Sequence, residues 1–210
     1  MSAFRLSLTA LFLCSAASPL LADSIPYAAV GTVAAQLTTT AKGSGGLDLY
    51  YLGSTAGYTD YVGVYDLQTG SNSGLLFNNR TTAVGTEAVV GSAPGQIAAG
   101  DQLIFYIDSP EGIFTSLADY NTDQTNHAYV TRFSGGTVNG VQIPSGLFVG
   151  MEDEAASHSD LNYNDLDFVV TNTSSSVTPE PSSFLLLGTG AFGLMVNLFR
   201  RRSGREAPND

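Results

Sequence analysis

The residues best suited to chemistry lie in one acidic stretch in the C-terminal third of the chain, directly after an apolar run. The stretch contains carboxylate and amide side chains and neither lysine nor arginine. Hard cations such as Ca²⁺ bind six to eight oxygen ligands and tolerate irregular geometry. We therefore predict a calcium site whose ligands are Glu152, Asp153, Asp160, Asn162, Asn164 and Asp165.

Part of this stretch has the spacing of a known calcium loop. Asp160, Asn162 and Asn164 occupy positions i, i+2 and i+4, as the oxygen ligands do in the first half of an EF-hand. Asp165 stands where the EF-hand requires a turning glycine, and Thr171 stands where it requires a bidentate glutamate. The stretch is therefore not an EF-hand. We expect an irregular site at a loop or strand edge, in which the acids at 152 and 153 fold back onto the later oxygens.

Two other interpretations of the acidic stretch stay open. Asp and Asn side chains also accept hydrogen bonds from nearby backbone, so the stretch could be a metal-free turn. Two of its acids could instead form the carboxylate pair of a glycoside hydrolase. That chemistry requires carboxyl groups about 5 to 9.5 Å apart, with the pKa of one of them raised.

The elements that must hold this stretch are predicted to be short strands. Runs of β-branched and aromatic residues alternate with Gly, Asn, Asp and Ser clusters, and outside the two ends of the chain no window keeps helical periodicity for three turns. We expect an all-β fold, an antiparallel β-sandwich or jelly-roll-like domain over residues 23–173. The expected strands are 36–40, 47–52, 61–66, 75–78, 86–90, 102–107, 129–133, 138–143, 147–151 and 166–170.

Two local features refine this prediction. Ser134-Gly135-Gly136 indicates a hairpin that joins strands 129–133 and 138–143. Residues 113–119 favour one short turn of helix.

The strand before the acidic stretch and the stretch itself resemble the signature of an uncharacterised β-rich domain family of bacterial extracellular proteins. The resemblance rests on the sequences from Phe148 to Asp153 and from Ser159 to Leu166, and it extends over residues 45–172. It implies a β-sandwich with a Ca²⁺ site and no established catalytic activity. The positions that match the family's acids and amide are Glu152, Asp153, Asp160, Asn164 and Asp165, while Asn162 replaces a frequent acid.

The chain ends with a polar turn, an apolar segment and a block of cations. Pro179, Glu180 and Pro181 precede the apolar residues 182–199, and Arg200-Arg201-Arg202 follow. Proline cannot continue a helix, and an apolar segment of this length almost spans a hydrocarbon core of ~30 Å. We expect a linker at 174–181, a transmembrane helix at 182–199 and a basic cytoplasmic tail at 200–210.

This combination of features resembles a PEP-CTERM protein-sorting signal. The resemblance implies a bacterial protein that is exported through the inner membrane and anchored there temporarily. An exosortase-type enzyme then processes the tail, and the protein reaches the cell surface or the extracellular medium. Carriers of such tails typically come from bacteria that make exopolysaccharide. The alternative is an ordinary membrane helix that is never cut.

The N-terminus and the charge of the chain agree with export. Residues 1–22 read as a secretory signal peptide, with Arg5 as its only charge and the single cysteine, Cys14, at the end of its apolar region. Between residues 23 and 180 there are 17 acidic and three basic residues, a net charge of −14. Such a surface repels nucleic acids and anionic lipids.

We therefore predict an exported, non-catalytic protein with a structural or adhesive role in an extracellular polysaccharide matrix. The alternative is a carbohydrate-binding module for the exopolysaccharide. Its candidate platform is the tyrosine group Tyr50, Tyr51, Tyr58, Tyr61 and Tyr65, which are otherwise expected to pack in the core. The two histidines, His127 and His158, are expected to be surface or packing residues rather than zinc ligands.

Overall fold

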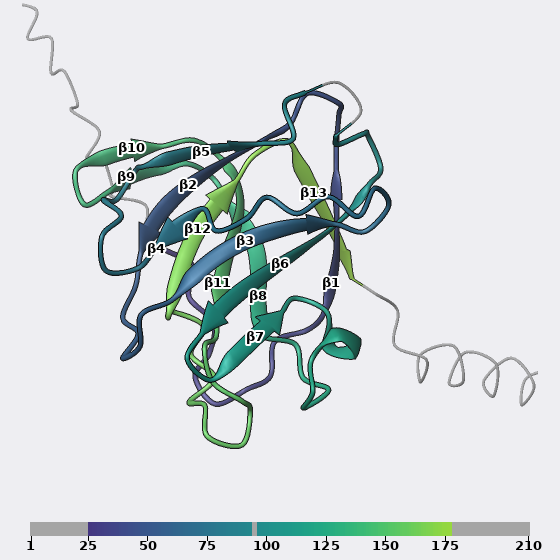
Figure 1. The fold of residues 1–210 in the computed structure, drawn as a ribbon. Coiled ribbons are helices and arrows are strands. Elements are labelled where there is room, and N and C mark those ends of the chain that lie inside the picture. The colour runs from purple at the N-terminus through teal and green to yellow at the C-terminus, as the bar shows by residue number, and fades with distance from the viewer. Residues whose placement is uncertain (1–24, 94–95, 178–210) are drawn as a thin grey trace, which may run out of the picture.

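Strands form nearly all the regular structure of the protein in the computed structural model, which describes residues 25–93 and 96–177 (Figure 1). The predicted signal peptide, transmembrane helix and cytoplasmic tail lie outside these residues. Among the described residues no helix has the length and apolar character that crossing a membrane requires. The elements are β1 (Leu37–Ala41), β2 (Leu47–Gly53), β3 (Tyr61–Asp66), β4 (Phe77–Asn78), β5 (Glu87–Val90), β6 (Gln102–Ser109), β7 (Gly112–Thr115), a 3-10 turn η1 (Ala118–Tyr120), β8 (Ala128–Phe133), β9 (Gly136–Val138), β10 (Val141–Ile143), β11 (Gly146–Met151), β12 (Leu166–Val170) and β13 (Thr173–Val177).

The strands form two larger sheets and one small hairpin, and all their pairings are antiparallel. Sheet A has the order β13-β1-β6-β3-β4, with β7 paired to β6. Sheet B has the order β5-β2-β12-β11-β8, and β9 pairs with β10. The prediction of an all-β fold with antiparallel sheets is confirmed.

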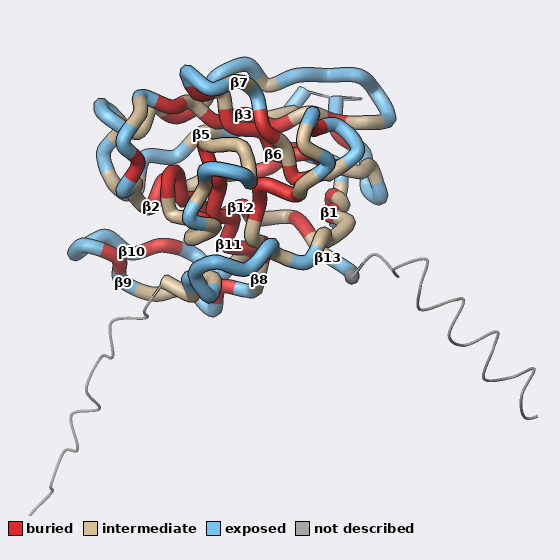
Figure 2. Tube along the Cα trace, turned by 90° about the horizontal axis from the view of Figure 1, so that it is seen from below, coloured by how far each residue is buried: buried red, intermediate tan, exposed pale blue. Residues whose placement is uncertain are grey.

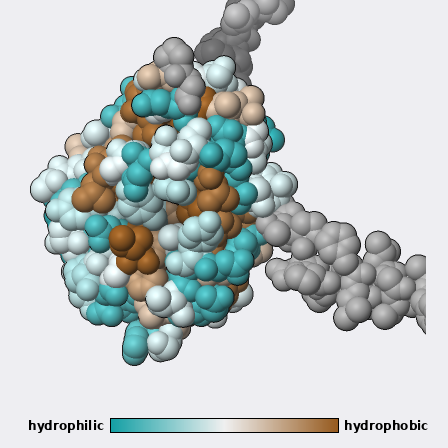
Figure 3. Space-filling model, turned by 45° about the vertical axis from the view of Figure 1, so that its right-hand side comes forward, coloured by the Kyte–Doolittle hydropathy of each residue, from teal (hydrophilic) through white to brown (hydrophobic). Residues whose placement is uncertain are grey.

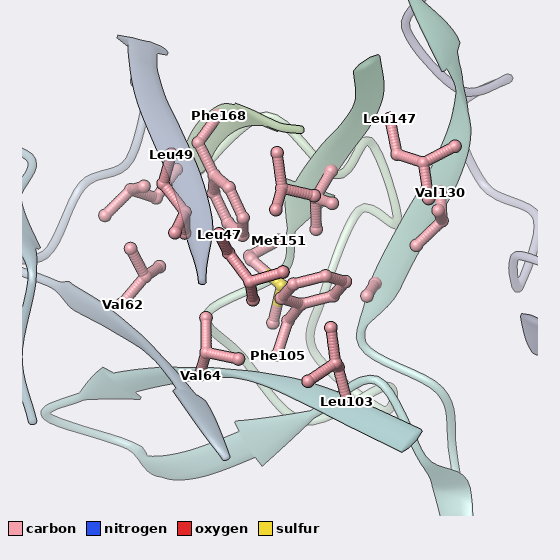
Figure 4. Packing of buried hydrophobic residues seen from close by; sticks show 14 of the residues in the cluster. Leu47, Leu49, Val62, Val64, Leu103, Phe105, Val130, Leu147, Met151 and Phe168 are labelled. Atoms are coloured by element: carbon pink, nitrogen blue, oxygen red, sulfur yellow. The ribbon is translucent and has the colours of Figure 1, made fainter. Parts of the chain in front are cut away.

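Sheets A and B face each other across a shared apolar core. Val62, Val64 and Phe105 of sheet A belong to the same buried cluster as Leu49 and Phe168 of sheet B (Figure 4). The alternation of side chains along each strand explains this arrangement, because every second residue points to the same face. Burying one such side chain contributes about 1.5–3 kcal/mol. In Figure 2 many of the buried segments belong to strands in the middle of the molecule, such as β6 of sheet A and β12 of sheet B.

The outer face of sheet B is covered as well. The β9–β10 hairpin places Val138 and Ile143 in a second cluster with Phe148 and Val169. All five residues of β12 are therefore buried. Four of these five residues are apolar, as is typical of a strand covered on both faces, and the exception is the buried Asp167.

The connection after β8 differs from the predicted hairpin. β8 pairs with β11, whereas residues 138–143 divide into β9 and β10. The division occurs at Asn139 and Gly140, whose φ angles are 47° and 83°. Both residues thus adopt the positive φ of a type I′ turn, for which Asn-Gly is the preferred pair. The prediction placed the turn at Ser134-Gly135-Gly136 and was wrong.

Two further predictions are corrected. Residues 113–119 do not form a helical turn as a unit, because Gly112–Thr115 is β7 and the 3-10 turn begins only at Ala118. The predicted linker begins inside the domain, since residues 174–177 belong to β13 and pair with β1 along its whole length. Serine and threonine face each other in this pair, and the hydroxyls of Thr40 and Ser174 are 3.1 Å apart. Ser-rich composition indicated a linker, but backbone pairing fixes the segment as an edge strand.

Candidate metal centre

The pairing of β11 with β12 brings the two ends of the acidic stretch together. Met151, the last residue of β11, lies opposite Leu166, the first residue of β12. The residues just outside this pair, Glu152, Asp153 and Asp165, are buried, and each offers a carboxylate oxygen within 4.8 Å of the others. The backbone N–H of Asp153 donates to Asp165 Oδ2 over 3.1 Å. The loop geometry therefore assembles three of the six predicted ligands.

A fourth carboxyl group joins the cluster from the opposite sheet. Asp60 comes just before β3 of sheet A, has no exposed surface, and interacts electrostatically with Asp153 and Asp165. Asn79 holds it in place: its Nδ2 donates to Asp60 Oδ2 over 2.8 Å, and its Oδ1 accepts from the Asp60 N–H over 3.0 Å. Ser109 at the end of β6 also reaches across, donating to the carbonyl oxygen of Asp153 over 2.7 Å. The sequence prediction did not include Asp60, because no local pattern relates it to residues 152–165.

Two oxygens of the acidic cluster (Asp60, Glu152, Asp153 and Asp165) lack any partner. Asp60 Oδ1 and Asp153 Oδ2 are buried without a hydrogen bond from the described residues. No lysine or arginine among those residues forms an ion pair with the cluster. A buried carboxylate left without a donor or a cation is costly, so this arrangement calls for a proton or a metal ion.

The electrostatics of the cluster agree with this conclusion. Burial raises the pKa of Asp60 to about 6 and the pKa values of Glu152, Asp153 and Asp165 to about 7. The negative charges of neighbouring carboxylates add to the effect, foremost that of Asp60 on Asp153 and that of Asp153 on Asp165. Both causes disfavour the charged forms. A bound cation would reverse this preference.

The remaining predicted ligands lie beside the cluster or away from it. Asp160 and Asn162 line a polar pocket of about 250 Å³ together with Glu152, Asp153 and Asp165. Asn162 donates to Asp160 through its backbone N–H over 3.2 Å and its Nδ2 over 2.7 Å.

Asn164 does not line this pocket. Its side-chain oxygen accepts a hydrogen bond from the Thr55 hydroxyl, and its backbone N–H donates to Asn162 Oδ1 over 3.0 Å. Residues 160–164 are thus held by local hydrogen bonds of the kind that the metal-free interpretation expects. Of the predicted ligands, Glu152, Asp153 and Asp165 belong to the acidic cluster.

The residues between these two parts explain the path of the loop. Leu161 and Tyr163 have φ angles of 52° and 54°. Left-handed backbone is unusual for such large side chains and requires support from the surroundings. Tyr163 receives this support: its ring is fully buried, its N–H donates to Glu152 Oε2 over 3.1 Å, and its hydroxyl donates to the carbonyl oxygen of Asn126 over 3.2 Å.

The histidines and tyrosines can also be placed. His127 is buried, stacks on Phe114 with 4.3 Å between ring centroids, and lies 2.9 Å from a carboxylate oxygen of Asp123, so it is a packing residue. His158 lines the rim of the polar pocket. Of the five tyrosines, Tyr51 is buried and contacts Phe77 in the core, while the other four are partly exposed.

A comparison with known protein families finds a match at the C-terminal end of the chain. Residues 177–202 match the family described as the PEP-CTERM protein-sorting motif. The chain carries a PEP-CTERM motif. The match begins at Val177, the last residue of β13, and includes Pro179, Glu180 and Pro181, so the resemblance seen in the sequence is confirmed.

The PEP-CTERM motif supports export through the membrane and processing by an exosortase-type enzyme. No curated protein and no solved structure matches the chain. The resemblance of the acidic stretch to a β-rich extracellular family stays a prediction.

Proposed function

We propose that this is an exported surface or matrix protein with a structural or adhesive, non-catalytic role, and that Ca²⁺ stabilises its β-sandwich domain. The PEP-CTERM motif supports delivery to the cell surface or the extracellular medium, with temporary anchorage at the membrane. The observation that carries the calcium proposal is the acidic cluster, where two sheets contribute buried carboxylate oxygens without partners.

The donor set favours a hard divalent cation. Asp60, Glu152, Asp153 and Asp165 offer only oxygen atoms, and neither histidine nor cysteine belongs to the cluster. Zinc prefers nitrogen and sulfur ligands, whereas Ca²⁺ and Mg²⁺ prefer oxygen. Calcium tolerates irregular geometry, and the adjoining polar pocket has room for water ligands. The residues therefore fit Ca²⁺ better than the other common metals.

The role of the ion would be to join the two sheets. Asp60 flanks β3 of sheet A, and the other three acids flank strands of sheet B. The only cysteine of the chain lies in the predicted signal peptide, so no disulfide is available to join the sheets in the exported protein. A ligand that binds only the native state stabilises it by about 2.7 kcal/mol at a hundred times its Kd.

Calorimetry of the full-length chain in detergent tests the proposal. We expect Ca²⁺ to raise the melting temperature by roughly 5 to 10 °C over the value in EDTA, since about 2–4 °C corresponds to 1 kcal/mol for a protein of this size. An unchanged melting temperature at millimolar Ca²⁺ would refute calcium binding. Mg²⁺ at the same concentration serves as the control for nonspecific charge screening.

Carbohydrate binding is a second candidate function, and one surface feature favours it. The outer face of β3, β6 and β7 forms a shallow groove of about 220 Å³, lined by Tyr65, Tyr106 and Tyr120. Elsewhere the surface facing the viewer in Figure 3 is mostly hydrophilic, with small separate hydrophobic areas. Aromatic rings at the surface can stack on sugar rings. A polysaccharide pull-down that loses nothing in a Tyr65→Ala, Tyr120→Ala double variant would count against this candidate.

A further inference from the structure

The few basic side chains of the domain are distributed unevenly. The described residues include 15 acidic side chains but only three basic ones, Lys42, Arg80 and Arg132. Lys42 and Arg132 are 90 positions apart in sequence, yet both line the same pocket of about 420 Å³. No acidic residue lines this pocket. It is thus a local positive site on a strongly acidic protein.

The topology explains how the two cations meet. Arg132 lies on β8, on the same face as the core residues Ala128 and Val130, because side chains alternate along a strand. It is exposed near the end of β8. Lys42 follows β1 directly, and its backbone N–H donates to the carbonyl oxygen of Asn172 over 2.8 Å. The pocket therefore lies between β8 and β11 of sheet B on one side and the start of β13 of sheet A on the other.

Neither cation is paired with an acidic side chain of the described residues. Both Lys42 and Arg132 are exposed. Around them the pocket has a polar lining of hydroxyl and amide side chains: Ser145, Asn172, Thr173, Ser174 and Ser175. The hydroxyls of Ser145 and Ser175 form no hydrogen bond with other described residues, so they are available to a ligand. Asn172 is held in a left-handed conformation, with its Nδ2 donating to the carbonyl oxygens of Gly43 and Gly46.

We propose that this basic pocket binds a small hydroxylated monoanion, of which a uronic acid unit of a saccharide is the example we commit to. Arginine and lysine together fit a carboxylate, since the guanidinium can donate two parallel hydrogen bonds to it. The serine hydroxyls fit the hydroxyl groups of the same ligand. The volume lies within the range of small-molecule sites, about 300–1,000 Å³, which a bare inorganic anion would not fill.

The charge of the whole domain argues against larger polyanions. Recognition of anionic membranes usually requires clusters of about four to eight basic residues, and nucleic acids require extended basic surfaces. Here two cations stand on a surface whose other charges are overwhelmingly negative. A single anionic unit can enter the pocket, whereas a dense polyanion or a lipid surface would be repelled by the rest of the domain.

Ligand-observed NMR titrations of the full-length chain test the proposal, in a polyoxyethylene detergent that contains no sugar. Galacturonate and galactose are observed directly, while sodium sulfate and mixed micelles that contain phosphatidylglycerol are tested by competition with galacturonate. We expect galacturonate to bind at least tenfold more tightly than galactose or sulfate. Arg132→Gln and Lys42→Gln should each weaken galacturonate binding at least tenfold, and Arg132→Lys should retain part of it.

Matched variants separate this pocket from the other sites. Arg80→Gln removes the third cation and should leave the affinity for galacturonate unchanged. Asp153→Asn alters the acidic cluster and should also leave it unchanged, so a failure of the calcium proposal would not affect this result. Circular dichroism should show that every variant is folded.

Several outcomes would overturn the proposal. They are the absence of galacturonate binding, equal binding by Arg132→Gln, and equal affinity for galactose. Equal affinity for sulfate would mean that the pocket holds any small anion and does not use the hydroxyl groups. Tighter binding of phosphatidylglycerol in mixed micelles than of galacturonate would assign the pocket to a lipid headgroup instead.

Discussion

Asp60 and Asp153 flank strands of different sheets, and their carboxyl groups interact within one buried cluster. They are separated by more than ninety positions in sequence, so only the packing of sheet A against sheet B brings them together. Two carboxylates this close repel each other unless a proton or a cation intervenes. Metal binding and pH should therefore both affect the stability of the domain through this pair of acids.

Replacing either acid should remove the response to calcium. Asp60→Asn and Asp153→Asn each withdraw one charged ligand while keeping the shape of the side chain. We expect the Ca²⁺-induced rise in melting temperature to fall below about 2 °C, and the stability in EDTA to stay the same or increase, because a repelling charge is lost. Scanning calorimetry measures both. Asp119→Asn, on an exposed acid of η1, is the matched control and should keep the full response.

Stability without calcium should fall as the pH rises from about 4 to about 7. The four acids of the cluster have raised pKa values of about 6 to 7, and burial also raises the pKa of Asp167 well above its ordinary value. The native state therefore binds more protons than the unfolded state in this range, and the slope of the unfolding free energy with pH is negative. The stabilising effect is complete below the unfolded pKa near 4 and is lost through the folded pKa values.

Urea unfolding at pH 4.5, 6 and 7.5, in EDTA and in Ca²⁺, measures this dependence. Calcium should offset the loss at pH 7.5 and have little effect at pH 4.5, where protons compete with it. A stability in EDTA that rises steadily over the same range would contradict the raised pKa values.

Gly150 should tolerate no side chain. A Cβ atom there would lie 2.1 Å from the carbonyl oxygen of Tyr163, which is backbone and cannot move aside without shifting the acidic loop. We expect Gly150→Ala to destabilise the domain by about 3 kcal/mol and to weaken the calcium response. The matched control is Gly57→Ala, where a Cβ atom would meet nothing within 4 Å. Equal urea midpoints for the two variants would contradict the expected clash between a side chain at Gly150 and the carbonyl oxygen of Tyr163.

The sorting motif predicts that the mature protein has a lower mass than the full chain. If an exosortase-type enzyme processes the tail, the surface or extracellular product lacks residues 200–210, and intact mass spectrometry of that product shows the loss. Replacing Pro179, Glu180 and Pro181 by alanine should leave the full tail in place and the protein in the membrane fraction. A wild-type product that keeps Arg200 to Asp210 would mean that the tail is only an anchor.

Local sequence patterns predicted the strands with strong periodicity. The bounds of β3 and β12 agree with the predicted ranges, because these strands are β-branched and apolar and have turn residues close by. The pair Asn139-Gly140 indicates the β9–β10 turn, because both residues readily adopt positive φ. The sequence prediction instead placed the turn at the glycines at 135 and 136.

Other features depend on contacts that no local pattern reveals. Asp60 becomes part of the cluster only through the packing of two sheets, and β13 is a strand only because β1 offers it a partner. The acidic stretch itself was found because its residues are adjacent in sequence. Its internal division into a turn and a cluster required the register of β11 with β12.

The pairing of β1 with β13 links the first strand of the domain to the residue where the PEP-CTERM motif begins. A polypeptide that crosses a membrane N-terminus first delivers β1 long before β13. The edge of sheet A therefore stays open until Thr173–Val177 have emerged, and non-local pairing of this kind forms slowly. Because the motif begins at the last residue of β13, it reaches the membrane directly after that strand has emerged. Slow closure of the sheet edge would then leave the domain incompletely paired while its sorting motif is already at the membrane.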